Sequence, residues 1–197
     1  MILRQNSALK KIIFILCVII LFSCKKKINL EKNQSLKVLV KSVLRQKVVL
    51  PEKMKIYKPF FDYKMSDKEI HDSKLVVYTE INASCGTCVS KINEWNKLAK
   101  ELSKYGVPVI LILRSDDDFE LFKYLAETDK IMKFLYPFYL DENEEFSKLN
   151  PFMRKNNDLK TVLVDQTNTI LIVGNPIYSE GIKELYLSQI KKRIATE

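Results

Sequence analysis

The sequence predicts an α/β fold with a central mixed sheet flanked by helices, preceded by an N-terminal helix-hairpin extension. Apolar, β-branched stretches alternate with amphipathic stretches over residues 74–194, which indicates parallel strands connected by helices. Two apolar runs, 161–165 and 170–173, lie close together in the chain and predict a closing β-hairpin. A C-x-x-C sequence, Cys85 to Cys88, stands where the first strand meets the first helix of this region.

The elements within residues 74–197 follow from their periodicity. Residues 107–113 are apolar throughout, as expected of a parallel strand covered on both faces. The helix over 89–105 carries an apolar stripe that places Trp95 in the core, and Gly106 ends it in the usual C-terminal glycine position. The predicted strands are 74–81, 107–113, 137–140, 161–165 and 170–173, and the predicted helices are 89–105, 116–128, 143–149 and 179–194.

Residues 35–73 form the predicted N-terminal extension. Apolar residues at helical spacing predict a helix over 35–46. The segments 47–51 and 54–57 then predict a short hairpin, and 58–73 reads as irregular.

The first 23 residues resemble a bacterial lipoprotein signal. A basic start is followed by the apolar run 12–22, which is short for a bilayer span of about 20 residues. Leu21-Phe22-Ser23-Cys24 is similar to a lipobox, which implies that Cys24 carries the lipid and that 24–34 is anchor and tether. The alternative is a short N-terminal anchor with an incidental cysteine. The signal peptide favours the cell envelope, with the protein lipid-anchored to a membrane and facing the periplasm.

Charge argues against a nucleic-acid partner. The net charge of +9 falls to +6 once the three basic residues of the signal are removed, and neither an Arg-rich stripe nor a Gly-rich phosphate loop accompanies it. Removal of the signal also removes Cys17, so Cys85 and Cys88 are the two thiols left beside the lipidated Cys24. Structural zinc needs four Cys or His ligands, and the sole histidine is His71. We therefore expect no metal and no cofactor.

The spacing of Cys85 and Cys88 favours a redox pair over a structural disulfide. Closing a four-residue loop contributes only about 2 kcal/mol in the loop-entropy model, and an exported protein lies where disulfides persist. A helix N-terminus should favour the thiolate of Cys85 and lower its pKa, and Cys88 lies one turn on. Glu80 could assist proton transfer, although a solvated carboxylate at the strand end is the expected state.

The order strand, C-G-T-C, helix, T-V-L-V-D, turn and I-L-I-V-G resembles the thioredoxin-like fold. With the lipid anchor, the chain is similar to the TlpA/ResA-type membrane-tethered thiol–disulfide oxidoreductases. The resemblance implies thiol–disulfide exchange, with Cys85 as nucleophile, Cys88 as resolving thiol and a Cys85–Cys88 disulfide. It also implies protein thiol or disulfide substrates and an upstream electron donor.

Two positions depart from that family. Ser84 stands where the family has a tryptophan, and Leu159 stands where it has a cis-proline that guides the substrate backbone. The resemblance makes Leu159 and Lys160 the candidate substrate-binding residues, with a trans peptide bond expected before Leu159.

Two functional hypotheses remain open from the sequence. The first is a lipid-anchored oxidoreductase that reduces protein disulfides. The second is a non-catalytic binding module at the membrane, in which Cys85 and Cys88 form only a local clasp. Turnover of a disulfide substrate distinguishes them.

Overall fold

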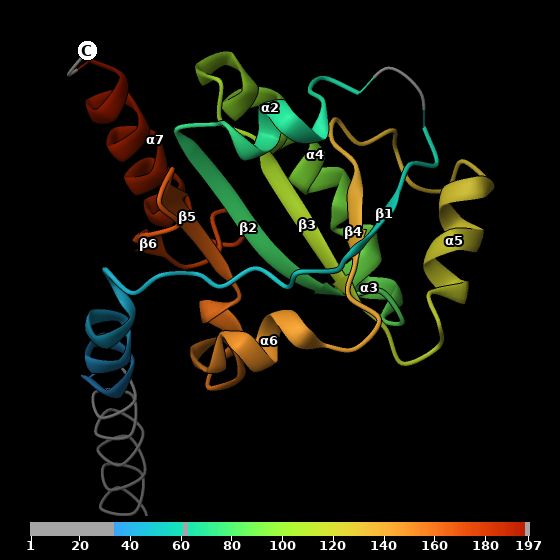
Figure 1. Ribbon diagram of the computed structural model, residues 1–197, viewed down its shortest axis with the longest axis horizontal. Helices are drawn as coiled ribbons and strands as arrows, with labels where there is room; N and C mark the ends of the chain where they lie inside the picture. Colours follow the sequence, from blue (N-terminus) through green and yellow to red (C-terminus); the bar gives the residue numbers. More distant parts are fainter. Residues whose placement is uncertain (1–33, 61–62, 196–197) are drawn as a thin grey trace, which may run out of the picture. The chain divides into compact units, whose positions relative to one another are not determined.

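The computed structural model describes residues 34–60 and 63–195 (Figure 1). The predicted signal peptide, Cys24 and nearly all of the tether lie outside these residues. Contacts divide the chain into two units, 1–42 and 43–197. In the first unit the described residues are helical, and this helix, predicted over 35–46, ends at Val43. No helix in the described part of the chain is both long and apolar enough to span a bilayer.

The second unit is built on a six-stranded mixed sheet of order β1-β4-β3-β2-β5-β6. β2 pairs in parallel with β3, and β3 with β4, whereas β1, β5 and β6 join antiparallel. β2 and β3 are buried on both faces, as their apolar sequences predict. The strands are β1 (Lys55–Tyr57), β2 (Leu75–Asn82), β3 (Val109–Arg114), β4 (Phe138–Leu140), β5 (Thr161–Asp165) and β6 (Ile170–Val173).

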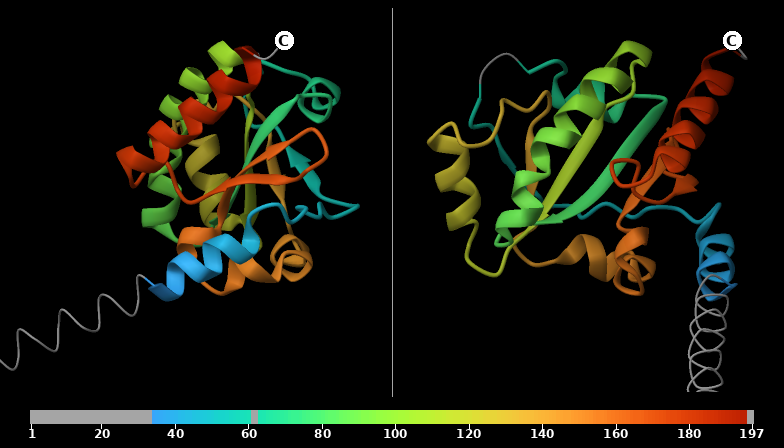
Figure 2. Two further views of the ribbon diagram at one scale, coloured as in Figure 1. Left: turned by 90° about the vertical axis from the view of Figure 1, so that its left-hand side faces the viewer. Right: turned by 180° about the vertical axis from the view of Figure 1, so that it is seen from behind.

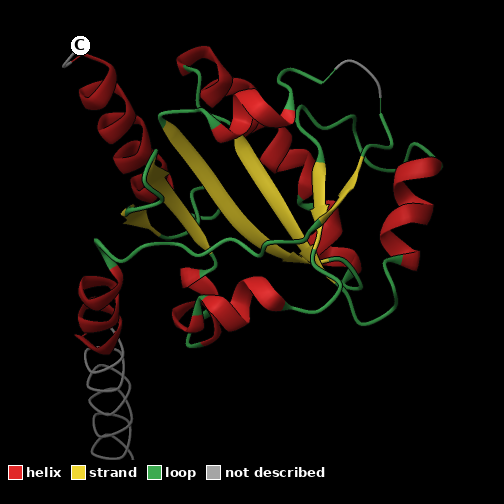
Figure 3. Cartoon of the chain, in the orientation of Figure 1, coloured by secondary structure: helices red, strands yellow, loops and turns green. Residues whose placement is uncertain are grey.

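Helices cover both faces of this sheet. α4 and α7 lie side by side on one face and α2 lies on the other (Figures 2 and 3), and an ion pair between Lys183 and Glu101 joins α7 to α4. The α-helices are α2 (Asp67–His71), α3 (Gly86–Ser90), α4 (Ile92–Leu102), α5 (Glu120–Glu127), α6 (Glu145–Leu149) and α7 (Glu180–Ala195). The short 3-10 turns are η1 (Ser103–Tyr105), η2 (Pro151–Arg154) and η3 (Asn157–Leu159). This is the thioredoxin-like α/β fold that the sequence predicts.

The predicted helix over 89–105 is present in three pieces. α3 begins at Gly86, three residues earlier than predicted, and Lys91 separates it from α4. η1 follows α4, and Gly106 ends it with a left-handed backbone (φ 70°), which glycine adopts without a steric cost. Trp95 is buried, as its place on the apolar stripe predicts.

The predicted hairpin of 47–51 and 54–57 is wrong. Lys47 bridges to Thr169 beside β6, whereas β1 pairs with β4 at the opposite edge of the sheet. The intervening chain crosses from one edge to the other and is held on the way by Asn150, whose side chain bonds both backbone groups of Val49 (Figure 1). Each outer edge of the sheet has backbone N–H and C=O groups that need hydrogen-bond partners. The two segments bind to these groups at different edges and therefore do not pair with each other.

Candidate active site

Cys85 lies at the junction that the sequence predicts, three residues after the end of β2 and at the start of α3. It is the N-cap residue of α3, with an extended backbone (φ −104°, ψ 106°). Its Sγ accepts a hydrogen bond from the backbone N–H of Cys88 at 3.3 Å. The hydroxyl of Thr87 lies 3.2 Å from the same sulfur. Hydrogen bonds to sulfur stabilise a thiolate, so the local backbone prepares Cys85 for that state.

A disulfide joins Cys85 and Cys88, whose Cα atoms are 5.2 Å apart. Both residues are partly exposed. The pair is therefore open to a thiol or disulfide arriving from solvent, unlike a disulfide enclosed in a core.

Ser84 ties the turn before Cys85 to the segment after β3. Its hydroxyl donates to Asp117 Oδ1 at 2.6 Å and accepts from the backbone N–H of Asp116 at 2.8 Å. Hydrogen bonds from Ser115 and Ser84 lower the pKa of Asp117, because they stabilise its charged form. A polar connection between two loops thus occupies the position at which the resemblance predicts tryptophan.

A pocket of about 350 Å³ lies beside the disulfide. Its lining includes Cys85, Cys88, Glu80, Arg114, Lys160 and Tyr178. Strand order explains how residues so distant in sequence meet. β2 and β3 run parallel and finish at the same end of the sheet, and the antiparallel β5 begins at that end. Figure 1 shows α3 at this end of the strands.

Glu80 is buried, contrary to the expectation of a solvated strand-end carboxylate. Its side chain is 2% exposed. Oε1 lies 2.7 Å from the Lys160 ammonium and 3.5 Å from Arg114 Nε. Among the described residues, Oε2 has no hydrogen-bond partner. The side chain sits inside the sheet because two cations from neighbouring segments compensate its charge.

The two candidate substrate-binding residues lie in different environments. Leu159 ends η3 with its side chain buried, and its N–H donates to the Asn156 carbonyl at 3.0 Å. Every peptide bond in residues 34–60 and 63–195 is trans, the bond before Leu159 included. Lys160 is half-buried in the pocket wall, and its ammonium is bound by Glu80.

Tyr178 is a residue that sequence reasoning missed. It lies in the segment between β6 and α7, lines the pocket and is 65% exposed. The Lys91 ammonium lies 5.8 Å from the centroid of its ring. No motif marks Tyr178 in the sequence; only the fold brings its segment beside the cysteines.

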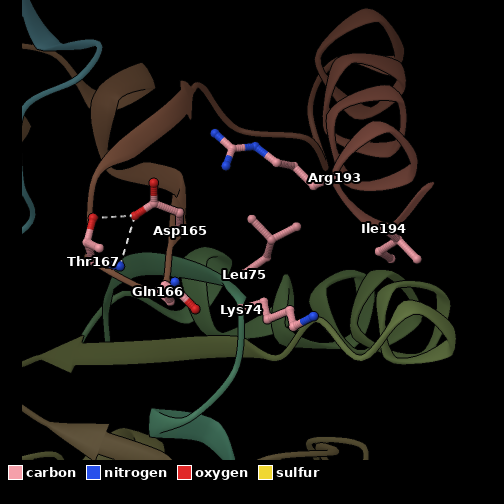
Figure 4. A pocket seen from close by; sticks show the side chains of 7 residues that line it. All are labelled: Lys74, Leu75, Asp165, Gln166, Thr167, Arg193 and Ile194. Carbon is pink, nitrogen blue, oxygen red and sulfur yellow. Dashed lines mark hydrogen bonds between the residues drawn. The ribbon is translucent and has the colours of Figure 1, made fainter. Parts of the chain in front are cut away.

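A second pocket, of about 320 Å³, lies at the other end of the sheet (Figure 4). It is lined by Lys74 and Leu75 at the start of β2, and by Asp165 and Arg193. The length of β2 places it about 23 Å from the cysteine end, at 3.3 Å per residue, so it is separate from the Cys85–Cys88 disulfide. Within the described residues, no group of three or more Cys, His, Asp or Glu side chains could hold a metal ion.

Comparison with known proteins identifies the family. The family model Redoxin matches residues 61–171, more than half of the chain. The chain belongs to the Redoxin family. The match spans β2 to the start of β6 and includes both cysteines, so the disulfide belongs to a Redoxin domain.

Solved structures similar to this Redoxin chain come from several bacteria. One is a candidate thioredoxin from Neisseria meningitidis, at 14% identity and a TM-score of 0.49, covering 77% of this chain and 95% of that one. A candidate protein disulfide isomerase from Bacteroides thetaiotaomicron is 20% identical with a TM-score of 0.48, covering 78% and 92%. The thioredoxin domain of a thiol-disulfide oxidoreductase from Bacteroides vulgatus is 16% identical with a TM-score of 0.41, covering 58% and 81%. No curated protein matches the chain.

Proposed function

We propose that this Redoxin domain performs thiol–disulfide exchange through Cys85 and Cys88, in the direction that reduces protein disulfides. The observation that carries the proposal is the partly exposed Cys85–Cys88 disulfide at a helix start, beside a pocket. Membership of the Redoxin family supports it.

The proposed chemistry moves two electrons to the substrate. The Cys85 thiolate attacks one sulfur of a substrate disulfide; a Cys85–substrate bond forms, the substrate disulfide breaks, and the released sulfur takes up a proton. Cys88 then loses its proton and attacks Cys85 Sγ, which closes the Cys85–Cys88 disulfide and releases the second substrate sulfur as a thiolate that takes up a proton. Glu80, the carboxylate in the pocket lining, accepts the Cys88 proton. A dithiol donor then reduces the pair for the next cycle.

The test uses a full chain in which Cys17 and Cys24 are replaced by alanine, so that Cys85 and Cys88 are its only thiols. Cys88→Ser should accumulate a mixed disulfide with a protein disulfide substrate, because nothing resolves it. Cys85→Ser should form none and should lose all reduction of that substrate. Mass spectrometry identifies the adduct and its site.

If the chain with both Cys85 and Cys88 intact reduces no protein disulfide, the oxidoreductase proposal is wrong. That result would favour the alternative, a non-catalytic binding module in which the disulfide is a local clasp. An adduct formed mainly at Cys88 in the Cys85→Ser chain would reverse the two assigned roles.

We also propose that the mature protein begins at Cys24 and is lipid-anchored in the cell envelope, facing the periplasm. The basic, apolar and Leu-Phe-Ser-Cys segments of residues 1–24 support this. Intact mass should show residues 1–23 removed and acyl chains on Cys24. Cys24→Ala should lose the acyl mass and leave the membrane fraction, whereas Cys17→Ala should change neither; wild-type protein without acyl chains would contradict the anchor.

A further inference from the structure

Lys160 contacts Glu80 twice, once through its backbone and once through its side chain. The Lys160 carbonyl accepts a hydrogen bond from the Glu80 N–H at 3.0 Å, and its ammonium lies 2.7 Å from Glu80 Oε1. Two bonds to one residue of β2 fix both the position of Lys160 at the start of β5 and the direction of its side chain. Its charge is thus held at the pocket wall.

Lys160 is also the nearer of the two cations beside Glu80. Arg114 Nε lies 3.5 Å from the same carboxylate oxygen, and Arg114 is shared with Asp116 and Glu144. Among the described residues, the ion-pair partner of Lys160 is Glu80. Most of the compensation of the Glu80 charge therefore falls to Lys160.

Reduction of the disulfide places a second negative charge in the same pocket, because Cys85 becomes a thiolate. Like charges in one poorly solvated site oppose each other. Other charged groups around the site are already paired: Lys91 with Glu94, and Asp117 with two hydroxyls. The charge of Glu80 thus affects the thiolate most strongly when Lys160 does not compensate it.

We propose that Lys160 is a positioning residue of this redox site: by neutralising buried Glu80 beside the disulfide, it stabilises the Cys85 thiolate and the reduced state. The proposal rests on Cys85 being the attacking sulfur of the proposed function. It gives the residue beside the missing cis-proline an electrostatic role. Removing the positive charge should disfavour the thiolate, and because the reduced state is then less stable, the disulfide should become harder to reduce.

The experiment uses the full chain with Cys17→Ala and Cys24→Ala, and compares Lys160→Met with Lys160→Arg. Lys160→Met keeps an unbranched side chain that is one atom shorter and removes its charge. The rate of Cys85 alkylation by iodoacetamide is followed against pH, and the reduction potential is measured against glutathione. For Lys160→Met, alkylation at neutral pH should slow about tenfold, its pH midpoint should rise, and the potential should become more negative. Lys160→Arg should retain both wild-type properties.

Lys155→Met is the matched control, because Lys155 is an exposed lysine five residues earlier in the chain. It should change neither the alkylation profile nor the potential. A purely structural role would lower the melting temperature of Lys160→Met without moving the pH midpoint, and that result overturns the proposal. If Lys160→Met does not fold, Lys160→Gln replaces it. Alkylation needs no protein substrate, so this test can fail or succeed independently of disulfide turnover.

Discussion

At Cys85, one backbone group and one side-chain group contact the sulfur directly and would stabilise its thiolate. The N–H of Cys88 donates to it, and the Thr87 hydroxyl lies beside it. α3 has five residues, so its dipole is small, and these local contacts take over the role that a long helix was expected to play. We infer that replacing Thr87 would change the stability of the Cys85 thiolate more than would changing charged residues farther along α4.

Tyr178 carries the residue-scale prediction. An exposed aromatic ring in the lining of a pocket is the kind of side chain that anchors a partner. Tyr178→Ala should raise the KM for a protein disulfide about tenfold and leave kcat nearly unchanged. The control is Tyr124→Ala on α5, where the ring is 54% exposed and away from the pocket lining. Equal effects of the two substitutions would remove Tyr178 from substrate binding.

The Cys85–Cys88 disulfide could be predicted from the sequence, whereas the buried carboxylate could not. A C-x-x-C after an apolar strand is a local pattern, so Cys85 and Cys88 are visible without a structure. The burial of Glu80 depends on Lys160, eighty residues away, and on Arg114 in another strand. The pattern of apolar and polar residues in β2 does not reveal which distant side chains will pair with Glu80.

Among the elements, the turn η3 limits the effect of introducing a proline before β5. Leu159 is 1% exposed, and its N–H is bonded to Asn156. Leu159→Pro removes that donor and part of the buried side chain, so it should reduce the free energy of unfolding by roughly 2–4 kcal/mol without raising the rate of disulfide reduction. Urea denaturation and turnover check the two effects.

Leu159→Met is the control for this position, since it keeps the N–H and nearly the same volume. Its unfolding free energy should fall by less than about 1.5 kcal/mol. A proline variant that is as stable as wild type and reduces disulfides faster would show that proline fits this loop.

Helices and strands were predicted well where the residues of the segment itself carry the pattern. β2, β3 and α4 follow from apolar runs or stripes within single segments. α2 was missed although Ser66 and Glu69 form a capping box around it, a signal that can be read in the sequence. The hairpin failed because its two segments pair with different edges of the sheet, which no local pattern reveals.

For the whole molecule, the strand order explains why the disulfide and the pocket beside it lie at one end of the sheet. β2 lies at the centre between β3 and β5, so the ends of two parallel strands and the start of an antiparallel one meet beside α3. Cys85, Arg114 and Lys160 each come from one of these three segments. The sequence predicts these strands but not which strands lie next to each other. The pocket depends on that strand order, so the sequence does not reveal it.

β1 has a consequence for how this domain behaves as a fragment. Its residues Lys55–Tyr57 pair with β4, yet they precede residue 61, where the Redoxin match begins. A chain shortened to that match would leave the outer edge of β4 open, with its backbone N–H and C=O groups available to another molecule. Phe138 and Leu140 would lose part of their cover at the same time. We expect such a fragment to associate edge to edge, so a fragment designed to avoid this should begin before Lys55.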